Sequence, residues 1–334
     1  MLPTLLWEKK EGDSVRCLVC SHHCLLKNGA HGVCRTRMNK NGRMTALLSD
    51  IVSSIQMDPI EKKPLYHFFP GSAVFSVGSF GCNLQCAFCQ NWHISMIRER
   101  NTVDGQAVQA QRLLELAKAH GAQSIAFTYN EPTLSLELIN ETVQRAQAFA
   151  LPVVLVSNGF MSSEFLEYVG AKVSAYNIDL KSYRDAFYRT YCKASLTPVL
   201  DNLVWLVSKG VWVEVTTLVI PHLNDSDEEL RDCARFIKES LGASVPWHIS
   251  AFHPAYKMEQ HPPTSKETLR RAYDIGKEEG LHFVYAGNIG FSFGADTLCP
   301  SCARPVIERS PYGIRCQTTG TCPSCGNAIA GVFA

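Results

Sequence analysis

Residues 73–92 read AVFSVGSFGCNLQCAFCQNW, and this stretch decides both the fold and the chemistry. Its first part, AVFSVGS, is an apolar and β-branched run that predicts a buried strand. Directly after the strand, Cys82, Cys86 and Cys89 follow one another with the spacing C-x3-C-x2-C. Three thiolates in one loop can hold three irons of a [4Fe–4S] cluster and leave the fourth iron open to a small molecule. A zinc site with a distant fourth ligand is the alternative at this point.

Six further apolar runs follow, and amphipathic stretches alternate with them. The runs predicted as strands, with 73–79, are 124–129, 152–157, 174–180, 211–220, 247–252 and 282–287. The stretches predicted as helices are 107–121, 135–150, 163–170, 197–210, 227–242 and 266–280. Strands separated by helices are typical of right-handed βα units. We therefore predict an α/β fold with a parallel barrel or open barrel, and an open doubly wound sheet is the competing topology.

The composition excludes several other classes of protein. With 334 residues, of which 46% are hydrophobic and 19% charged, the chain is long and apolar enough for one large folded domain with attachments. The 32 basic and 31 acidic residues nearly cancel, which argues against nucleic acid or an anionic membrane as the main partner. No apolar run reaches the roughly 18 residues of a membrane span, and the N-terminus lacks a signal-peptide pattern. We expect a cytoplasmic protein.

Fourteen cysteines in a reducing compartment favour metal ligands or catalytic groups over disulfides. At the C-terminus, residues 293–334 are predicted to form a separate module. It carries two C-P-S-C knuckles with the spacing of a zinc ribbon, made by Cys299, Cys302, Cys322 and Cys325. We predict structural zinc there, with a rubredoxin-like iron as the alternative. Cys316 is surplus and is predicted to be a packed thiol.

Residues 1–70 are predicted to be an N-terminal extension that ends in a proline-punctuated loop. Its four cysteines, which offer either a zinc site or a second iron–sulfur cluster, are Cys17, Cys20, Cys24 and Cys34. We favour structural zinc there. Four side chains in the loop, Lys62, Lys63, Tyr66 and His67, either touch the substrate or belong to a solvated connection. The isolated Cys192 and Cys233 are interpreted as ordinary thiols.

The motif C-x3-C-x-φ-C, in which the aromatic Phe88 precedes the last cysteine, resembles the radical S-adenosylmethionine (radical SAM) superfamily. The resemblance implies that the open iron binds the amino and carboxylate groups of S-adenosylmethionine. One electron from the cluster then cleaves this cofactor to methionine and a 5′-deoxyadenosyl radical, which abstracts hydrogen from a substrate. It further implies an oxygen-sensitive oxidoreductase with an electron donor such as flavodoxin or ferredoxin.

Other motifs, in order DPIEKKPLYHFFPG, TYNEPT, SNGF, DLKSYRDAFYR, HISAFHPAYKM and VYAGN, resemble the radical SAM member of the AmmeMemoRadiSam group. This group is related to pyruvate formate-lyase activating enzymes. The resemblance implies a partial (βα)6-type barrel over residues 71–292, and AMMECR1-like and Memo-like proteins as partners. It does not identify a substrate.

Polar residues at the ends of the predicted strands are candidates for the cofactor pocket, because function in α/β barrels lies at that end. By resemblance, Glu131 receives the cofactor's ammonium, although Tyr129 and Asn130 replace the usual two glycines of G-G-E-P. The other residues that the resemblance or their position places at the cofactor are Phe88, Asn158, Asp179, Lys181 and His253, and weaker candidates are Thr216 and Asn288. The alternatives are an Asn-Gly turn at Asn158, a structural ion pair between Asp179 and Lys181, and a structural histidine.

The leading hypothesis is therefore a radical SAM enzyme that acts on an unidentified substrate. One alternative is a glycyl-radical-enzyme activase, which needs a protein partner. A second is a metal-binding interaction module, in which the C-terminal knuckles dock another molecule. Residues 299–334 carry only Arg304, Arg309 and Arg315 against Glu308, which is too little positive charge for a phosphate-binding surface.

Overall fold

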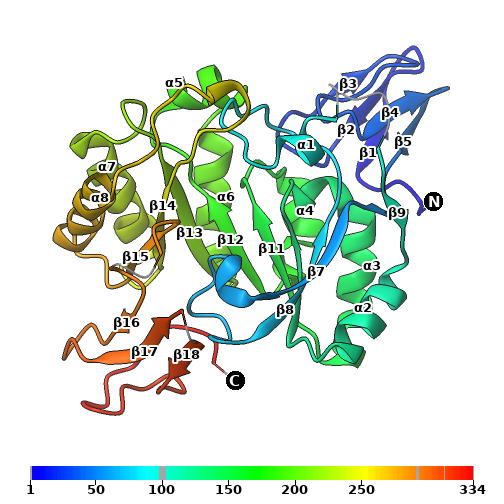
Figure 1. Cartoon of the computed structure of the whole chain (residues 1–334). Coiled ribbons are helices and arrows are strands. Elements are labelled where there is room, and N and C mark those ends of the chain that lie inside the picture. Colours follow the sequence, from blue (N-terminus) through cyan, green and yellow to red (C-terminus); the bar gives the residue numbers. More distant parts are fainter. Residues whose placement is uncertain (1, 98–102, 291–292, 312, 334) are drawn as a thin grey trace.

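One open, twisted sheet of eight strands forms the body of the protein (Figure 1). We analysed a computed structural model, which describes residues 2–97, 103–290, 293–311 and 313–333. In spatial order the strands are β7 (Ser54–Pro59), β8 (Ala73–Gly78), β10 (Ser124–Thr128), β11 (Val153–Ser157), β12 (Ala175–Asp179), β13 (Trp212–Val219), β14 (Trp247–Ala251) and β15 (Val284–Gly287). The last seven are parallel, and they match the seven apolar runs. The α/β prediction is confirmed.

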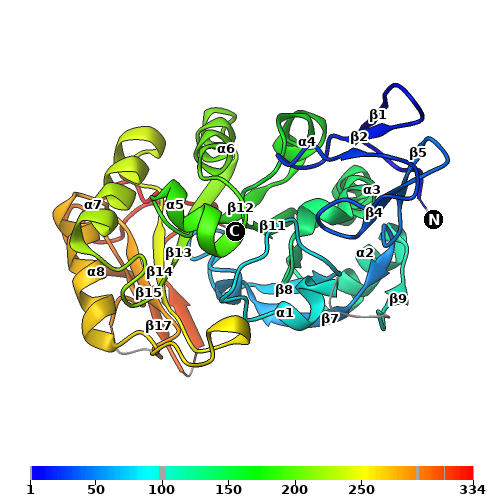
Figure 2. The same cartoon turned by 90° about the horizontal axis from the view of Figure 1, so that it is seen from above.

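Helices cover the outer face of the parallel strands and connect them (Figure 2). They are α2 (Ala110–Ala119), α3 (Leu136–Ala146), α4 (Ser163–Tyr168), α6 (Thr197–Ser208), α7 (Asp227–Phe236) and α8 (Lys266–Glu278). Three of them begin at a serine whose hydroxyl accepts a hydrogen bond from the backbone N–H three residues on; these are Ser162, Ser226 and Ser265. Because helices pack on this face and loops cover the other, the strands are almost continuously apolar.

Short helices lie in the connections. The α-helical ones are α1 (Trp92–Ser95) and α5 (Asp185–Phe187). The 3₁₀ turns are Ile60–Lys62, Pro132–Ser135, Gln147–Phe149, Gly170–Lys172 and Tyr256–Met258, and π-helical turns span Tyr188–Cys192 and Ile237–Leu241.

The N-terminal segment folds as small antiparallel sheets beside the main sheet. Its strands are β1 (Trp7–Lys9), β2 (Val15–Cys17), β3 (Leu25–Leu26), β4 (Arg37–Lys40), β5 (Arg43–Ala46) and β6 (Ile51–Val52), the last paired with β9 (Gln106–Ala107). Arg37 anchors it to α3 through two hydrogen bonds of 2.8 Å to the carboxylate of Glu137. Both side chains are 1% exposed, so loss of either would leave an uncompensated buried charge, at a cost of about 3–5 kcal/mol.

Residues 54–59 differ from the prediction of a loop before residue 70. They form β7, which pairs antiparallel with β8 and makes one edge of the main sheet. Proline is tolerated on an edge strand, where its missing N–H is not needed for pairing, so Pro59 did not prevent strand formation.

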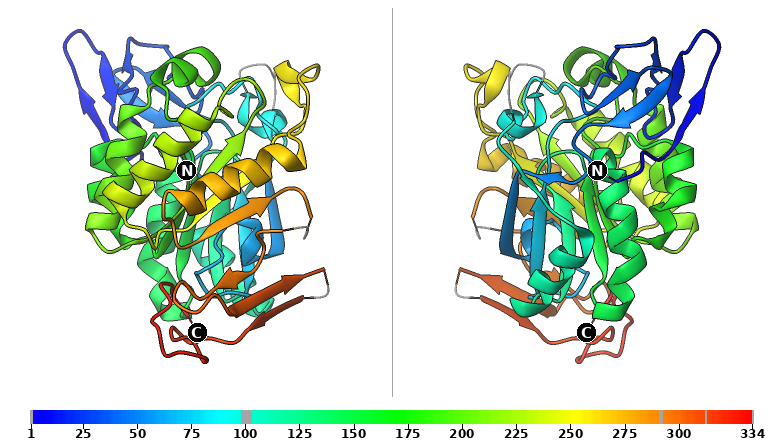
Figure 3. Two further views of the ribbon diagram at one scale, coloured as in Figure 1. Left: turned by 90° about the vertical axis from the view of Figure 1, so that its left-hand side faces the viewer. Right: turned by 90° about the vertical axis from the view of Figure 1, so that its right-hand side faces the viewer.

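The C-terminal module lies below the sheet, at the opposite end of the molecule from β1–β5 (Figure 3). It is a sheet of β16 (Thr297–Leu298), β17 (Pro305–Ser310) and β18 (Gly313–Cys316). The predicted boundary at 292 falls on residues 291–292, which are outside the described residues. Backbone hydrogen bonds of 2.7 Å link Phe69 and His67 to Val332 and hold the module against the loop before β8.

A buried polar network joins this module to the sheet. Glu214 of β13 accepts hydrogen bonds from the backbone N–H groups of Tyr66 (2.9 Å) and His67 (2.8 Å) and from His248 Nε2 (2.6 Å). Arg309 of β17 donates to the carbonyl oxygen of Tyr66 at 2.7 Å. Of the two alternatives left open for Tyr66 and His67, neither substrate contact nor a solvated connection holds, because hydrogen bonds to Glu214 and Arg309 keep both residues against the C-terminal module.

No helix within the described ranges is long and apolar enough to cross a membrane.

Candidate active site

A cavity of about 350 Å³ lies at the carboxyl ends of the parallel strands, and this volume is in the range of small-molecule sites. Its walls come from the segments that follow β8, β10, β11 and β12 and from the interior of β13 and β14. They include most of the residues singled out in the sequence, namely Cys82, Cys86, Phe88, Cys89, Glu131, Asn158, Asp179 and Lys181, with Thr216 and Asn288. The fold thus brings one cysteine triplet and several charged and polar side chains to one space.

The cysteine loop is held in place by backbone and side-chain hydrogen bonds. The Leu84 N–H donates to Cys82 Sγ at 3.3 Å. Gln85 and Ala87 donate their N–H groups to carbonyl oxygens of the π-helical turn at Tyr188–Cys192, at 2.8 and 2.9 Å. Burial raises the pKa of the Cys89 thiol to about 11, which disfavours the thiolate in the free protein. Coordination to a metal would stabilise the thiolate and so offset this effect.

Cys192 is a neighbour of this loop that the sequence did not indicate. It is fully buried, and its thiol lies near that of Cys86, whose pKa it helps to raise. The two residues are far apart in the sequence, and the π-helical turn that ends at Cys192 has no clear sequence pattern. Cys192 is thus positioned to interact with Cys86.

Glu131 is buried and is not an ordinary surface glutamate. Its Oε1 accepts hydrogen bonds from the N–H and hydroxyl of Thr133 and from the Ser157 hydroxyl at 2.8 Å. Among the described residues, Oε2 accepts one, from the Asn158 N–H at 2.8 Å. Burial raises the pKa of its carboxyl, against the lowering effect of these hydrogen bonds. Since each carboxylate oxygen has two lone pairs, Oε2 retains acceptor capacity at the cavity wall.

Tyr129 takes the place of a glycine without changing the backbone geometry. Its φ of 75° lies in the left-handed region that glycine favours. The ring packs over Gly78, where a β-carbon would lie 2.9 Å from Tyr129 Cδ2, and the hydroxyl donates to Asp58 Oδ2 at 2.6 Å. The Lys63 ammonium lies 2.8 Å from the same oxygen and 4.5 Å from the ring centroid. Lys63 is therefore buried in a polar cluster, whereas Lys62 lines the cavity.

Asp179 and Lys181 form an ion pair in the cavity wall, with Lys181 Nζ and Asp179 Oδ2 2.8 Å apart. Burial alone would lower the pKa of Lys181, but the charges of Asp179, Cys86 and Cys192 raise it well above its usual range. The ammonium also lies 5.9 Å from the centre of the Phe88 ring. This pair fixes the Lys181 ammonium in the cavity wall that also holds the cysteine triplet, with Asp179 balancing its charge.

Asn158 lines the cavity, as expected of a ligand-binding side chain, whereas His253 does not. Asn158 Nδ2 donates to Asn83 Oδ1 at 2.8 Å and to Cys82 Sγ at 3.6 Å, so its amide is engaged with the cysteine loop. His253 is exposed, and its Nε2 lies 3.4 Å from the carbonyl oxygen of Asn288. Asn288 lines the cavity, and His253 lies outside the lining.

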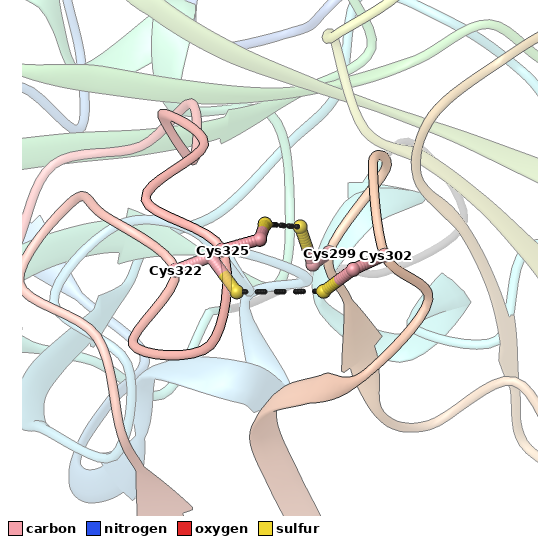
Figure 4. A group of neighbouring side chains, drawn as sticks. All are labelled: Cys299, Cys302, Cys322 and Cys325. Atoms are coloured by element: carbon pink, nitrogen blue, oxygen red, sulfur yellow. Dashed lines mark hydrogen bonds between the residues drawn. The ribbon is translucent and has the colours of Figure 1, made fainter.

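The four C-terminal thiols converge on one point (Figure 4). The Sγ atoms of Cys299 and Cys325 are 3.6 Å apart, and those of Cys302 and Cys322 are 3.7 Å apart. A Zn–S bond of about 2.3 Å in a tetrahedron requires a sulfur–sulfur separation of about 3.8 Å. Burial alone would raise the pKa of Cys322, but backbone N–H groups and the neighbouring thiols lower it to about 6. The site is suited to a tetrahedral metal ion.

Two remaining cysteines lie apart from any metal-binding set. Cys316 is exposed, so the prediction of a packed thiol was wrong; its place on β18, at the edge of a small sheet, explains the exposure. Cys233 is buried in α7, as expected of an ordinary thiol.

Comparison with known proteins identifies the class of enzyme. A family model described as the radical SAM superfamily matches residues 76–237. An uncharacterized protein of Methanocaldococcus jannaschii, MJ0808, is 38% identical over 333 residues, which cover 98% of this chain and 99% of that protein. The chain belongs to the radical SAM superfamily and is an enzyme of the radical SAM type. The family implies a [4Fe–4S] cluster and S-adenosylmethionine.

More distant relatives indicate which radical SAM enzymes the chain resembles. The pyruvate formate-lyase 1-activating enzyme of Escherichia coli is 22% identical over 224 residues, covering 61% of this chain and 89% of that enzyme. The crystal structure of Streptococcus suis SuiB bound to S-adenosylmethionine has a TM-score of 0.52 at 16% identity, and covers 76% of this chain and 58% of that one. The first supports a relation to the activating enzymes, and the second supports the fold.

Proposed function

We propose that the chain cleaves S-adenosylmethionine reductively at a [4Fe–4S] cluster bound by Cys82, Cys86 and Cys89, and uses the resulting 5′-deoxyadenosyl radical to abstract hydrogen from a substrate. The observation that carries the proposal is the cavity itself. Its wall combines the cysteine triplet with the Asp179–Lys181 ion pair and Glu131. These groups fit the two cofactors that the family implies, because three thiolates can bind three irons and the charged groups match an amino acid.

Each side chain then has a definite task. Glu131 Oε2 accepts a hydrogen bond from the cofactor's ammonium, and Lys181 binds its carboxylate. Phe88 packs beside the cluster, and Asn158 orients Cys82 through the hydrogen bond to its sulfur. His253 contacts the carbonyl oxygen of Asn288, which lines the cavity, and its assignment to the cofactor rests on the motif HISAFHPAYKM. Exposure to oxygen is expected to destroy the cluster.

The biological setting is that of the AmmeMemoRadiSam group, with AMMECR1-like and Memo-like proteins as partners and flavodoxin or ferredoxin as electron donor. The motifs along residues 58–288 support this assignment. Calorimetry with the purified chain and a purified Memo-like protein tests this partner assignment. Absence of a heat of binding at micromolar concentrations would exclude the Memo-like protein as a partner.

A second candidate is an activase that installs a glycyl radical on a protein. It is favoured by the match to the E. coli activating enzyme over 89% of that enzyme. Electron paramagnetic resonance of a candidate partner, after incubation with the chain, cofactor and reductant, distinguishes the two. A glycyl-radical signal supports the activase, and cofactor cleavage without such a signal on any candidate partner supports another substrate.

The test of the main proposal is anaerobic reconstitution followed by assay of 5′-deoxyadenosine after reduction with dithionite. Wild type is expected to make it, and a variant with Cys82, Cys86 and Cys89 all changed to Ala to make none. Glu131→Gln and Asp179→Asn are expected to weaken cofactor binding about tenfold or more while iron content is retained. Cys316→Ser is the matched control, since its thiol lies outside all three cysteine sets. Loss of iron with unchanged cofactor binding in Glu131→Gln would contradict the assignment.

A further inference from the structure

The four N-terminal cysteines form a third cluster of thiols. Cys17, Cys20 and Cys34 are buried and Cys24 is half-buried. Burial raises the pKa of Cys17, Cys20 and Cys24, and the charges of neighbouring thiols of this set raise it further. Cys17 lies in β2 and the other three lie in connections between strands, and Cys20 pairs with Met161 between β11 and α4.

Their spacing differs from that of a zinc site. In the part of the chain that the structure describes, the C-terminal set is the one group of three or more His, Cys, Asp or Glu side chains whose ligand atoms all lie within 4.8 Å of one another. The N-terminal thiols are therefore more widely spaced, as are Cys82, Cys86 and Cys89. Thiolates on one zinc ion lie about 3.8 Å apart, whereas each thiolate of an iron–sulfur cluster binds a different iron and is further from its neighbours.

A glycine and a buried arginine lie beside these thiols. A β-carbon on Gly32 would lie 3.6 Å from Cys34 Sγ and 3.8 Å from Cys24 Sγ, so Gly32 is next to both thiols. Arg37, which is 1% exposed, interacts electrostatically with Cys17 and Cys34. Its Nε has no hydrogen-bond partner among the described residues. A buried N–H of this kind calls for an acceptor, which a sulfide or thiolate of a cluster provides.

This thiol cluster adjoins the central cysteine loop at two points. The carbonyl oxygen of Cys34 lies 3.1 Å from the position of a β-carbon on Gly81, the residue before Cys82. On the other side, His22 Nε2 lies 2.8 Å from the carbonyl oxygen of Asn83, the residue after Cys82. Cys82 of the central triplet thus has neighbours on both sides that contact the N-terminal segment, one through Cys34 and the other through His22.

We propose that Cys17, Cys20, Cys24 and Cys34 bind a second [4Fe–4S] cluster, which passes single electrons to the central one. The proposal builds on the proposed function, and it replaces structural zinc as the assignment of this site. A one-electron donor of the flavodoxin or ferredoxin class reduces the N-terminal cluster. That cluster is then reoxidised as the central cluster is reduced by the same electron, and no bond forms or breaks in the transfer.

The decisive experiment uses the full chain with Cys82, Cys86 and Cys89 changed to Ala, reconstituted anaerobically with ferrous iron and sulfide. We expect about four irons and four sulfides per chain and a paramagnetic signal after reduction. Further change of Cys20 and Cys24 to Ser is expected to remove all the iron, and Cys316→Ser to remove none. A chain that takes up zinc in place of iron at this site, or binds no metal there, overturns the proposal. The iron count does not depend on cofactor cleavage, so the second cluster can be detected even if the proposed function is wrong.

The relay is tested with Cys20 and Cys24 changed to Ser in an otherwise wild-type chain. We expect 5′-deoxyadenosine formation to fall about tenfold or more with flavodoxin as donor, and to stay within about twofold with dithionite, which reaches the central cluster through the open cavity. Equal rates for variant and wild type with flavodoxin contradict the relay, and so does an equal loss with both reductants. A full central iron content in the variant confirms that its barrel is folded.

Discussion

Tyr129 and Asp58 connect two strands that do not touch each other. Tyr129 follows β10, Asp58 lies in β7, and β8 runs between them, yet the Tyr129 hydroxyl donates to Asp58 Oδ2 at 2.6 Å. The tyrosine ring passes over Gly78 of β8, which has no side chain to block it. This hydrogen bond links the edge strand β7 to the segment after β10 that lines the cavity.

Removal of that hydroxyl by Tyr129→Phe is expected to lower the free energy of unfolding by about 1–2 kcal/mol, because it leaves a carboxylate with one partner fewer. The aromatic ring and the left-handed backbone are retained, so the fold is preserved. Urea unfolding measures the change. Tyr168→Phe, at an exposed tyrosine on α4, is the matched control. If both variants unfold at the same urea concentration as wild type, the hydrogen bond does not stabilise the sheet edge.

His67 makes the stability of the protein depend on pH. Burial lowers the pKa of His67 to about 4, although the nearby Glu214 acts in the opposite direction, and Arg309 and His248 face the same ring. In the unfolded chain its pKa is near 6.5. The unfolded state therefore gains a proton as the pH falls from about 6.5 to 4, whereas the folded state does not. The stabilisation is complete above pH 6.5 and decreases by about 3 kcal/mol toward pH 4.

Urea unfolding of wild type and His67→Gln at several values between pH 7 and pH 4.5 measures this effect. The variant is expected to be less stable at pH 7 and to have a flatter pH dependence. His120→Gln, at the exposed residue that directly follows α2, should behave like wild type. Parallel curves for wild type and His67→Gln would assign the pH dependence to other groups.

Loss of the C-terminal metal is expected to destabilise the lower end of the sheet. Cys302→Ser removes one of four tetrahedral ligands, and a sheet of three short strands cannot bury enough apolar surface to fold alone. We expect zinc content to fall from one ion per chain to none and the thermal midpoint to drop by several degrees. Metal analysis with calorimetry checks both values, and unchanged zinc in Cys302→Ser would contradict a four-thiolate site.

Cys192 is expected to tune the reduction potential of the central cluster. If Cys86 binds the cluster as a thiolate, the neighbouring Cys192 thiol is expected to donate a hydrogen bond to its sulfur, and such bonds stabilise a reduced cluster. Cys192→Ala should lower the potential while four irons stay bound. A redox titration followed by paramagnetic resonance measures it, with Cys233→Ala as the buried-thiol control. A potential equal to that of wild type would show that the thiol only fills space.

The seven parallel strands could be predicted because strands buried on both faces form continuous apolar runs. Cys82, Glu131, Asp179 and Lys181 could be placed at one end of the sheet because each lies at the end of such a run or within three residues after it. This part of the site depends on local pattern and on the parallel topology alone.

Other features depend on contacts between distant segments and were not predictable. β7 became an edge strand because β8 offered it a partner, although its proline favoured a loop. His67 is buried because the C-terminal module covers it, 263 residues further along the chain. The contact of Cys192 with Cys86 requires a π-helical turn, which no residue pattern marks.

The attachment of the C-terminal module to the loop before β8 determines which contacts of the protein can form last during its synthesis. His67 Nδ1 donates to the carbonyl oxygen of Ala330 at 2.6 Å, and the backbone N–H of Phe69 donates to Val332 at 2.7 Å. Neither partner exists until the ribosome has translated residues 330–332. The strands of the main sheet can pair during translation, but the C-terminal module can cover the His67 segment only afterwards. A nascent chain that stalls before residue 330 is therefore expected to leave this segment exposed to cellular proteases.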